Sequence, residues 1–287
     1  MKNKVPLSIL IPAKNEEKNI DRCLEPIADW ANEILIVDSK STDKTREIAE
    51  SFGAKVIEFD YKGGWPKKRQ WALDTYPFRN DWILLLDSDE ILLPDTKLEI
   101  EKAIAQTELN GYWLPLNIYF LGRLLRYGST TLLKLSLFKK GKGRYEQRVA
   151  NQDNSMADME IHEHIIVDGK VGFIKSPIKH ENINTLDRYI QKHNEYSNWE
   201  ALAHVQGGNG ELKARFWGIQ AERRRWLRKK FMGLPALPVF IFLYFYVFKL
   251  GFLDRKAGLI YNLFRAVHFF HVKAKIYELG IIEDKNK

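Results

Sequence analysis

The chain has 287 residues, 45% of them hydrophobic and 29% charged, which is enough for one large or two smaller domains with a buried core. The single cysteine, Cys23, excludes an intramolecular disulfide framework and a cysteine-rich zinc site, and it favours a reducing compartment. Lysine and arginine total 45 against 37 aspartate and glutamate residues, and the net charge of +8 indicates an anionic partner: nucleic acid, a membrane surface or a phosphorylated substrate.

Short apolar runs alternate with helical patterns through the first hundred residues. The predicted strands are Leu7–Ile11, Glu33–Val37, Lys55–Phe59 and Trp82–Leu86, and the predicted helices are Glu16–Ala28, Asp43–Ser51, Pro66–Leu73 and Pro94–Gln106. This alternation predicts an α/β fold of the nucleotide-binding type, with a mostly parallel sheet and helices on both faces. Ligands of such sheets bind beyond the carboxyl ends of the strands.

After Gly111 the pattern changes from alternation to a run of strands followed by helices. The predicted strands are Tyr112–Tyr119, Leu132–Phe138, Ile161–Val167 and Val171–Ile174, with Asp168–Gly169 as a hairpin turn between the last two. The predicted helices are about Thr185–His204, 211–231 and Ala257–Leu279, and residues 206–210 are a linker. We therefore expect one domain over residues 1–205 and a separate helical region over 206–287.

The positive charge is concentrated at the start of that helical region. Residues 211–230 contain eight basic and two acidic side chains, and the aromatic tract Leu234–Phe248 follows them. Fifteen residues with two prolines are too few for a bilayer span, which needs about 20 apolar residues. Basic residues beside aromatic ones are typical of a segment that lies in a membrane interface, and a buried helical subdomain is the alternative.

The sequence disfavours secretion and a nucleic acid partner. No secretory signal is expected, because the first apolar run, Leu7–Ile11, is short and ends at Pro12. Arg223–Arg225 are not accompanied by any signature of an RNA-binding module, so we expect no nucleic acid partner.

Asp87-Ser88-Asp89 directly follows the apolar strand at Trp82–Leu86. Two carboxylates at a strand end are suited to hold Mg²⁺ or Mn²⁺ against phosphate oxygens. Such a triplet also occurs by chance as a solvated turn, so its place at the carboxyl end of a buried strand is what favours a metal site.

Two further polar segments follow predicted strands in the same way. The first contains Asn15 and Glu16 and opens a predicted helix, where backbone N–H groups suit an anion or a polar base edge. The second begins at Asp38, which is placed to accept a hydrogen bond from a ring nitrogen or a ribose hydroxyl. Helix capping by Asn15, Ser41 or Thr42 is an alternative that is compatible with both interpretations.

Taken together, these segments resemble glycosyltransferase family 2, which has the GT-A fold. The family's P-x-x-N-E matches Pro12, Asn15 and Glu16, its V-D-x-x-S-x-D matches residues 37–43, and its D-x-D matches Asp87 and Asp89. Residues 63–73 resemble the family's G-x-x-x-x-R-N-x-x-L region, with Gln70 where asparagine is usual.

The C-terminal half is similar to a subgroup that transfers sugars in lipopolysaccharide-core and related envelope glycan assembly. The similar segments are Ile161–His164, Asp168–Gly169, Pro177–His180 and Gly251–Gly258. The last of these is close to the subgroup's G-F-L-D-G-x-x-G, with Arg255 in place of the glycine that follows the aspartate.

The resemblance implies a role for each matching residue. Residues 1–110 would bind the nucleotide sugar and 111–205 the acceptor. The nucleotide-sugar ligands would be Pro12, Asn15, Glu16, Asp38, Lys67, Arg69 and Asp87, and the metal ligands would be Asp87 and Asp89. Lys67 and Arg69 would offset the charge of the diphosphate, although a basic helix start can also be a solvated face. His180 is a further candidate for the metal shell.

Inverting transfer also requires a carboxylate that takes the proton of the acceptor hydroxyl. Glu163 is the candidate base, and Asp158 and Glu160 are alternatives in the same stretch. The neighbouring His162 and His164 do not form the H-E-x-x-H zinc motif.

The sequence thus predicts a metal-dependent, inverting glycosyltransferase that uses a nucleotide sugar, with a UDP-hexose as the expected donor and Mg²⁺ or Mn²⁺ as cofactor. Its acceptor would be a lipid-linked or lipopolysaccharide-core-type glycan, and residues 211–253 would bind an anionic membrane at its cytoplasmic face. The alternative is a non-catalytic, membrane-docked module with the same fold. A nucleotidyltransferase is disfavoured because Ile11–Glu17 lacks that class's glycine-rich segment.

Overall fold

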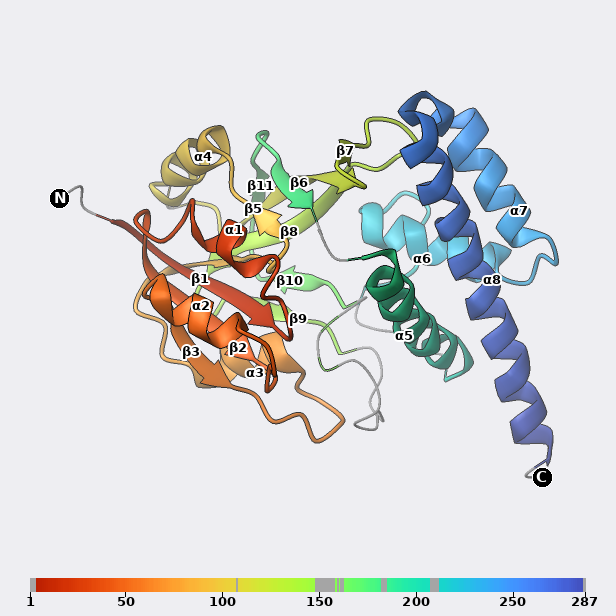
Figure 1. Ribbon diagram of the computed structural model, residues 1–287, viewed down its shortest axis with the longest axis horizontal. Helices are drawn as coiled ribbons and strands as arrows, with labels where there is room; N and C mark the ends of the chain where they lie inside the picture. Colours follow the sequence, from red (N-terminus) through yellow and green to blue (C-terminus); the bar gives the residue numbers. More distant parts are fainter. Residues whose placement is uncertain are drawn as a thin grey trace.

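The computed structural model describes residues 4–106, 108–147, 158, 160, 163–181, 185–206 and 212–285. A body built around a sheet occupies one side of the molecule, and a group of longer helices from the C-terminal third occupies the other (Figure 1). The predicted linker at 206–210 lies outside the described residues except for Gln206.

One mixed sheet forms the centre of the body, with the strand order β3-β2-β1-β4-β8-β6-β12-β5. The first four strands in this order are parallel, as the sequence predicts, and β8 runs antiparallel to β4 and β6. These strands are β1 (Val5–Ala13), β2 (Ala31–Asp38), β3 (Lys55–Glu58), β4 (Trp82–Leu85), β5 (Glu90–Ile91), β6 (Gly111–Phe120), β8 (Leu132–Lys139) and β12 (Ile178–Glu181). Two short strands, β7 (Arg123–Leu124) and β11 (Val171–Phe173), also pair with β6.

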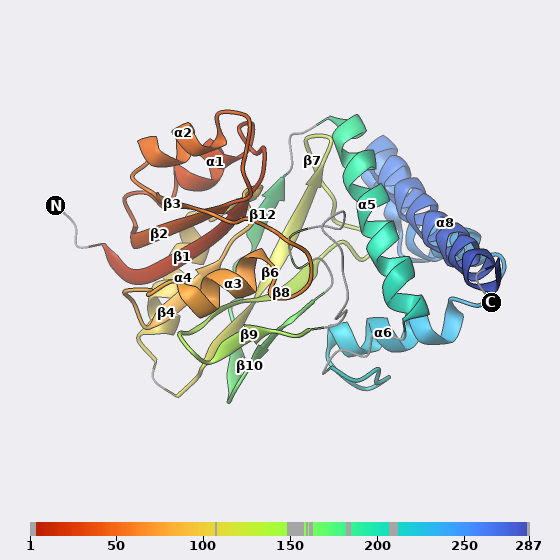
Figure 2. The ribbon, with the colours of Figure 1, turned by 90° about the horizontal axis from the view of Figure 1, so that it is seen from below.

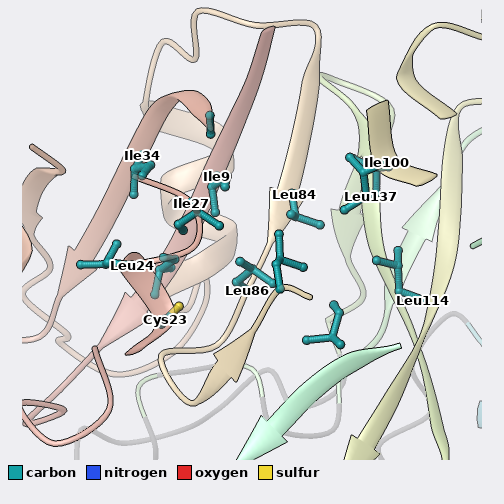
Figure 3. Packing of buried hydrophobic residues seen from close by; sticks show 14 of the residues in the cluster. Ile9, Cys23, Leu24, Ile27, Ile34, Leu84, Leu86, Ile100, Leu114 and Leu137 are labelled. Carbon is teal, nitrogen blue, oxygen red and sulfur yellow. The ribbon is translucent and has the colours of Figure 1, made fainter. Parts of the chain in front are cut away.

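Helices cover both faces of the sheet because alternate side chains of its central strands point to opposite sides. In β1, Ile9 belongs to the cluster that includes α1, α2 and α4, whereas Leu10 belongs to the cluster that includes α3. Figure 3 shows the first cluster, which contains Cys23 and Leu24 of α1 together with Ile9 and Leu84 of the sheet. The helices of the body are α1 (Ile20–Leu24), α2 (Thr45–Ser51), α3 (Lys68–Thr75) and α4 (Pro94–Ile104). The α/β class with helices on both faces is confirmed.

Two predicted helices are shorter in the structure. The helix expected over Glu16–Ala28 is reduced to α1, because the N–H groups before it bond to the next loop and because Pro26, which has no backbone N–H, cannot donate the next hydrogen bond of the helix. The helix expected over 211–231 begins only at Gln220 as α6 (Gln220–Phe231), where the Glu222 carboxylate accepts a hydrogen bond from the Ile219 N–H at 3.0 Å.

The predicted hairpin at Asp168–Gly169 is wrong. The strand before this turn, β10 (Ile165–Val167), pairs with β9 (Gly143–Tyr145) in a separate two-stranded sheet. The strand after it, β11, pairs in parallel with β6 of the main sheet. Gly169 has a φ of 109°, which glycine tolerates, so the turn passes the chain from one sheet to the other.

The C-terminal third consists of helices that pack on one another beside the sheet. They are α5 (Leu186–Val205), α6, α7 (Leu237–Phe242), a π-helical segment η1 (Leu243–Phe248), a 3₁₀ turn η2 (Gly251–Asp254) and α8 (Arg255–Lys285). Figures 1 and 2 both show α5 between the sheet body and α8. Within the described residues no single helix is long and apolar enough to span a membrane, and one pair, Leu237–Phe248 with Gly251–Ile282, passes that test only as a unit bent by 75°.

The segment Gly251–Gly258 joins these helices to the loop that follows β7. The Asp254 carboxylate accepts hydrogen bonds from the backbone N–H groups of Arg126 and Tyr127, at 3.1 and 3.0 Å. A Cβ at Gly258 would lie 2.2 Å from the Gly251 carbonyl oxygen, so only glycine allows this close approach. The motif shared with the envelope-glycan subgroup therefore has a structural role: it holds the C-terminal helices against the loop after β7.

Arg255 occupies a backbone conformation that suits glycine. Its φ is 56° and its ψ is −141°, a region in which side chains with a Cβ are strained by about 1–3 kcal/mol. The related subgroup has glycine at this position, and the backbone conformation gives the physical reason.

Replacing Arg255 with glycine is therefore expected to raise the free energy of unfolding by about 1 kcal/mol, as measured by urea denaturation. Lys256→Gly is the matched control, because Lys256 is the next residue and lies within the regular helix α8. The control is expected to lose up to about 1 kcal/mol. Destabilisation by both substitutions would contradict the strain at Arg255.

Candidate active site

The polar segments identified in the sequence meet at the carboxyl edge of the parallel strands. The ends of β1 and β2 are level, because Ala13 pairs with Asp38 in the parallel register. Leu86 directly follows the neighbouring strand β4, its N–H bonds to the Leu10 carbonyl at 3.1 Å, and Asp87 comes next. Pro12 is buried within β1 at this edge. The structure thus brings together the segments that the family resemblance assigned to the donor.

The loops after β1 and β2 are hydrogen-bonded to each other. The Asn15 N–H donates to Ser41 Oγ at 2.8 Å, and the Asn15 side chain accepts from the Thr42 N–H at 2.8 Å. The Glu16 N–H donates to Thr45 Oγ1 at 2.7 Å. Asn15 has a φ of 55°, which asparagine tolerates better than most residues. These contacts fix the two loops as one unit, and Asn15 is not a helix cap.

Asp38 is buried at the base of this unit. Its carboxylate accepts hydrogen bonds from the backbone N–H of Ser41, at 2.9 Å, and from the Ser41 hydroxyl. Its backbone carbonyl accepts a hydrogen bond from the Phe59 N–H at 2.8 Å. Phe59 follows β3 and lines an open pocket of about 380 Å³. Aromatic side chains of Phe59, Tyr61, Trp65 and Trp71 line this pocket. The proposed role of Asp38 in binding the base or ribose stays a prediction.

Asp87 lies between two cations. Its carboxylate pairs with the Arg69 guanidinium and with Lys134 Nζ at 3.0 Å, and Lys134 also bonds to Glu90 at 2.9 Å. Burial raises the pKa of a carboxyl group, but Arg69 and Lys134 outweigh burial and hold the pKa of Asp87 well below its usual range. Both oxygens of Asp87 are therefore engaged with the protein, and Asp87 is the more structural of the two aspartates.

Asp89 lies beside His180, which β12 brings to the same edge. Their Oδ1 and Nδ1 atoms are 3.3 Å apart, and Asp89 is buried. Burial raises the pKa of Asp89, but His180 and Lys192 outweigh it and keep this carboxylate ionised. Burial lowers the pKa of His180, yet the carboxylates around it, Asp89 foremost, raise that pKa to about 9.

The described residues contain no group of three or more His, Cys, Asp or Glu side chains arranged as a ready metal cage. The chemistry of Asp89 and His180 nevertheless fits a divalent ion, because a carboxylate oxygen and an imidazole nitrogen that has given up its proton to the incoming metal are ligands that Mn²⁺ accepts. Two protein donors suffice where the phosphates of a substrate and water complete the coordination shell.

Three consecutive basic residues at the start of α3 are buried, and each has a carboxylate partner. Lys67 Nζ lies 3.5 Å from Glu163, and Lys68 Nζ lies 3.3 Å from Asp158. The Arg69 guanidinium lies 3.8 Å from the Glu160 carboxylate, in addition to its contact with Asp87. Lys67 and Lys68 are each about 1% exposed, so the interpretation of this segment as a solvated face is wrong.

The same three carboxylates are the candidate bases, and the structure separates them. Glu160 accepts hydrogen bonds from the backbone N–H groups of Arg69 and Gln70, at 3.2 and 2.9 Å, so it closes the N-terminus of α3. Both of its oxygens are used in this way, and burial raises its pKa. Glu163 was expected within a strand over Ile161–Val167, but the observed strand β10 begins only at Ile165. Glu163 lies beside Lys67, whose ammonium is 5.5 Å from the centre of the Trp199 ring. His162 lies outside the described residues.

Several residues of the site were missed in the sequence. Lys134 is a charged residue within an otherwise apolar strand, and Glu90 directly follows the aspartate pair. These unusual positions were the signals from which the sequence could have indicated the two residues. Lys192 and Tyr196 come from α5. Lys192 interacts electrostatically with Asp89 across the site, and Tyr196 is hydrogen-bonded to Lys192. Nothing in the sequence near them indicates this, because Asp89 lies about a hundred residues earlier in the chain.

The parallel-strand edge, the aspartate pair and the interlocked loops define a mixed α/β transferase of the GT-A type. The sequence model of Glycosyl transferase family 2 matches residues 8–179, and the chain belongs to this family. The resemblance found in the sequence is thereby confirmed.

Two relatives of this chain are named as glycosyltransferases. It is 29% identical over 286 residues to the lipopolysaccharide core biosynthesis glycosyltransferase LpsC of Rhizobium meliloti (strain 1021), an alignment that covers 96% of this chain and 93% of LpsC. It is 28% identical over 232 residues to an uncharacterized glycosyltransferase of Rickettsia bellii (strain RML369-C), with coverage of 78% and 75%.

Solved structures with some likeness to the chain include S. aureus TarS 1-349, at 16% identity and a TM-score of 0.47, covering 96% of this chain and 91% of that one. A glucosyl-3-phosphoglycerate synthase from Mycobacterium tuberculosis is 23% identical with a TM-score of 0.31, covering 40% of this chain and 44% of that one.

Glu160→Gln is expected to lower the free energy of unfolding by about 3 kcal/mol, because the amide cannot accept from both N–H groups and leaves Arg69 short of a charge partner. Urea denaturation measures this change. Glu25→Gln, at an exposed position, is the control and is expected to stay within about 0.5 kcal/mol of the wild type. Equal stability of the two variants would show that Glu160 does not hold α3.

Proposed function

We propose that this family 2 glycosyltransferase is metal-dependent and inverting, and that it transfers a hexose from a UDP-sugar to a lipid-linked or lipopolysaccharide-core-type glycan. The observation that carries the proposal is the pair of Asp89 and His180, 3.3 Å apart at the carboxyl edge of the parallel strands. Ligands of doubly wound sheets bind at this edge, and a metal held there would meet the donor's diphosphate.

Asp89 and His180 would hold the metal, which when bound offsets the negative charge of the diphosphate. Asp87 would act mainly by fixing Arg69 and Lys134 at the site. The interlocked loops that carry Asn15 and Asp38 would bind the nucleoside.

Glu163 is the proposed base. It would take the proton of the acceptor hydroxyl while that oxygen forms a bond to the anomeric carbon and the bond from that carbon to the diphosphate breaks. Glu163 lies 3.5 Å from the ammonium of Lys67, which in turn lies over the Trp199 ring. Asp158 stays the alternative, and Glu160 is a weaker one because both of its oxygens accept hydrogen bonds from the backbone of α3.

The donor proposal is tested by thermal stabilisation and hydrolysis assays against UDP-, GDP-, CMP- and dTDP-sugars, with and without Mn²⁺. We expect a metal-dependent response to a UDP-sugar. Asp89→Ala is expected to lower turnover by about 10²-fold or more while the circular dichroism spectrum stays unchanged, because Asp89 holds metal and does not pack the core.

Asp29→Ala, which removes an exposed aspartate, is the matched control and should retain full turnover. Undiminished turnover by Asp89→Ala would contradict the metal site. A wild-type protein that responds to no nucleotide sugar would favour the alternative, a non-catalytic membrane-docked module.

We also propose that the C-terminal helices dock on the cytoplasmic face of the cell membrane, where a lipid-linked acceptor is presented. Trp217 is 93% exposed and Phe248 is 76% exposed, and the basic helix α6 lies between them in the chain. Exposed aromatic rings beside lysine and arginine suit the headgroup region of an anionic membrane. The name of LpsC, a lipopolysaccharide core enzyme similar over nearly the whole chain, supports this kind of acceptor.

Exposed basic residues of α6 allow a clean test of this docking. Arg225 is unsuitable because it pairs with the buried Glu146, so the variant changes Arg223, Lys229 and Lys230 to glutamine. Each basic residue near an anionic leaflet contributes about 1 kcal/mol, so the partition coefficient on phosphatidylglycerol vesicles is expected to fall about 100-fold in a sedimentation assay.

The control changes Lys102, Lys170 and Lys175, which are exposed on the sheet body, to glutamine. An equal loss of vesicle binding in both triple variants would show that general charge, not the α6 surface, governs membrane association.

A further inference from the structure

Helix α5 presents one side to the active site although it packs with the C-terminal helices. Lys192, Tyr196 and Trp199 are spaced at i, i+4 and i+7, so they lie on one side of the helix. Trp199 lies at the Lys67–Glu163 pair, Lys192 interacts electrostatically with the aspartates of the sheet edge, and Tyr196 is hydrogen-bonded to Lys192. In Figure 2, α5 stands between the sheet body and α8. This side of α5 therefore faces the donor residues from opposite the sheet.

Lys192 is the cation that α5 brings to this place. Its ammonium interacts electrostatically with the carboxylates of Asp89, Glu16 and Asp87. The Tyr196 hydroxyl is its hydrogen-bond partner one turn along the helix. Lys192 and Tyr196 are both half-buried, so each retains a surface from which a ligand can be reached.

The opposite side of α5 is fixed to α8 and α6, which leaves Lys192 little freedom to move away. Lys275 of α8 donates to the Asn194 carbonyl at 2.9 Å and to Ser197 Oγ at 2.7 Å. Glu200 lies 2.9 Å from Arg228 of α6 and 3.1 Å from His268 of α8. A cation held in this way is already positioned before a ligand arrives, which lowers the cost of binding.

We propose that Lys192 is a ligand of the donor's diphosphate, oriented by Tyr196, so that the C-terminal helices contribute a binding residue to the site. The inference rests on the proposed function, because it requires a nucleoside diphosphate at Asp89. The diphosphate would place its negative charge among carboxylates, and a lysine ammonium with three donors is suited to neutralise it there. As the anomeric bond breaks, its electron pair goes to a phosphate oxygen, where Lys192 would stabilise the developing charge.

A different role for Lys192 would be to act only as a counter-ion of Asp89 and Glu16. The two roles differ in what they predict for ligands with one or two phosphates. A diphosphate ligand should distinguish UDP from UMP, whereas a counter-ion should affect metal binding and stability but not the number of phosphates preferred.

The test compares the binding of UDP, UMP and inorganic pyrophosphate to the full chain by isothermal titration calorimetry, with Mn²⁺ present. In Lys192→Met, the dissociation constant of UDP is expected to rise about 10- to 100-fold, and that of UMP by less than about 3-fold. Lys192→Arg should recover part of the UDP affinity. Arg188→Met is the matched control, because Arg188 is an exposed cation one turn earlier on α5, and both affinities should stay unchanged.

Equal losses for UDP and UMP, or no loss for either, would overturn the inference in favour of the counter-ion role. Pyrophosphate separates this failure from a failure of the proposed donor. Pyrophosphate binding that is lost in Lys192→Met supports the inference even if the uridine nucleotides do not bind. A wild-type protein that binds neither pyrophosphate nor any of these nucleotides overturns it.

Discussion

The structure depends on a buried array of opposite charges at the start of α3. Lys67, Lys68 and Arg69 point into the protein, and each meets a carboxylate from the segment that contains residues 158, 160 and 163. Buried charges are costly unless they are paired and hydrogen-bonded, so removing one partner destabilises a protein more than the intact pair stabilises it. The array therefore holds the second half of the chain against the first. Because Arg69 also meets Asp87, it carries the same constraint to the carboxyl end of β4.

A second constraint joins the C-terminal helices to this body. Asp254 binds the backbone of the loop after β7, and the close approach of Gly251 and Gly258 allows η2 and α8 to lie against it. Helix α8 in turn fixes α5, which returns to the active site with Lys192. The surface that we propose to dock on a membrane is thus connected to the site by two packed helices. A donor site completed in this way would be positioned by the same elements that bring it to a lipid-linked acceptor.

The pattern of the sequence was sufficient for the main strands and for the segments at their ends. Buried strands such as β1 and β4 are continuous apolar runs, and polar residues after such runs must meet at one edge of a parallel sheet. Partners that are distant in the chain were not accessible in this way. The failure of the hairpin at Asp168–Gly169 shows the reason, since a turn signal fixes a change of direction but not which sheet each strand joins. The shortening of α1 at its C-terminal end has a local cause that was present in the sequence, because Pro26 has no backbone N–H to donate to the helix.

By itself the sequence determined the α/β class, the family and the identity of the aspartate pair, because these follow from hydrophobic periodicity and from residues close together in the chain. The tertiary structure alone decided which carboxylate each basic residue of α3 meets, and it placed both oxygens of Glu160 on backbone N–H groups. It also placed His180 beside Asp89 and Lys192 opposite them. Such pairings depend on how strands and helices far apart in the chain are packed, and the energy of a charge depends on burial, which no local pattern of residues encodes.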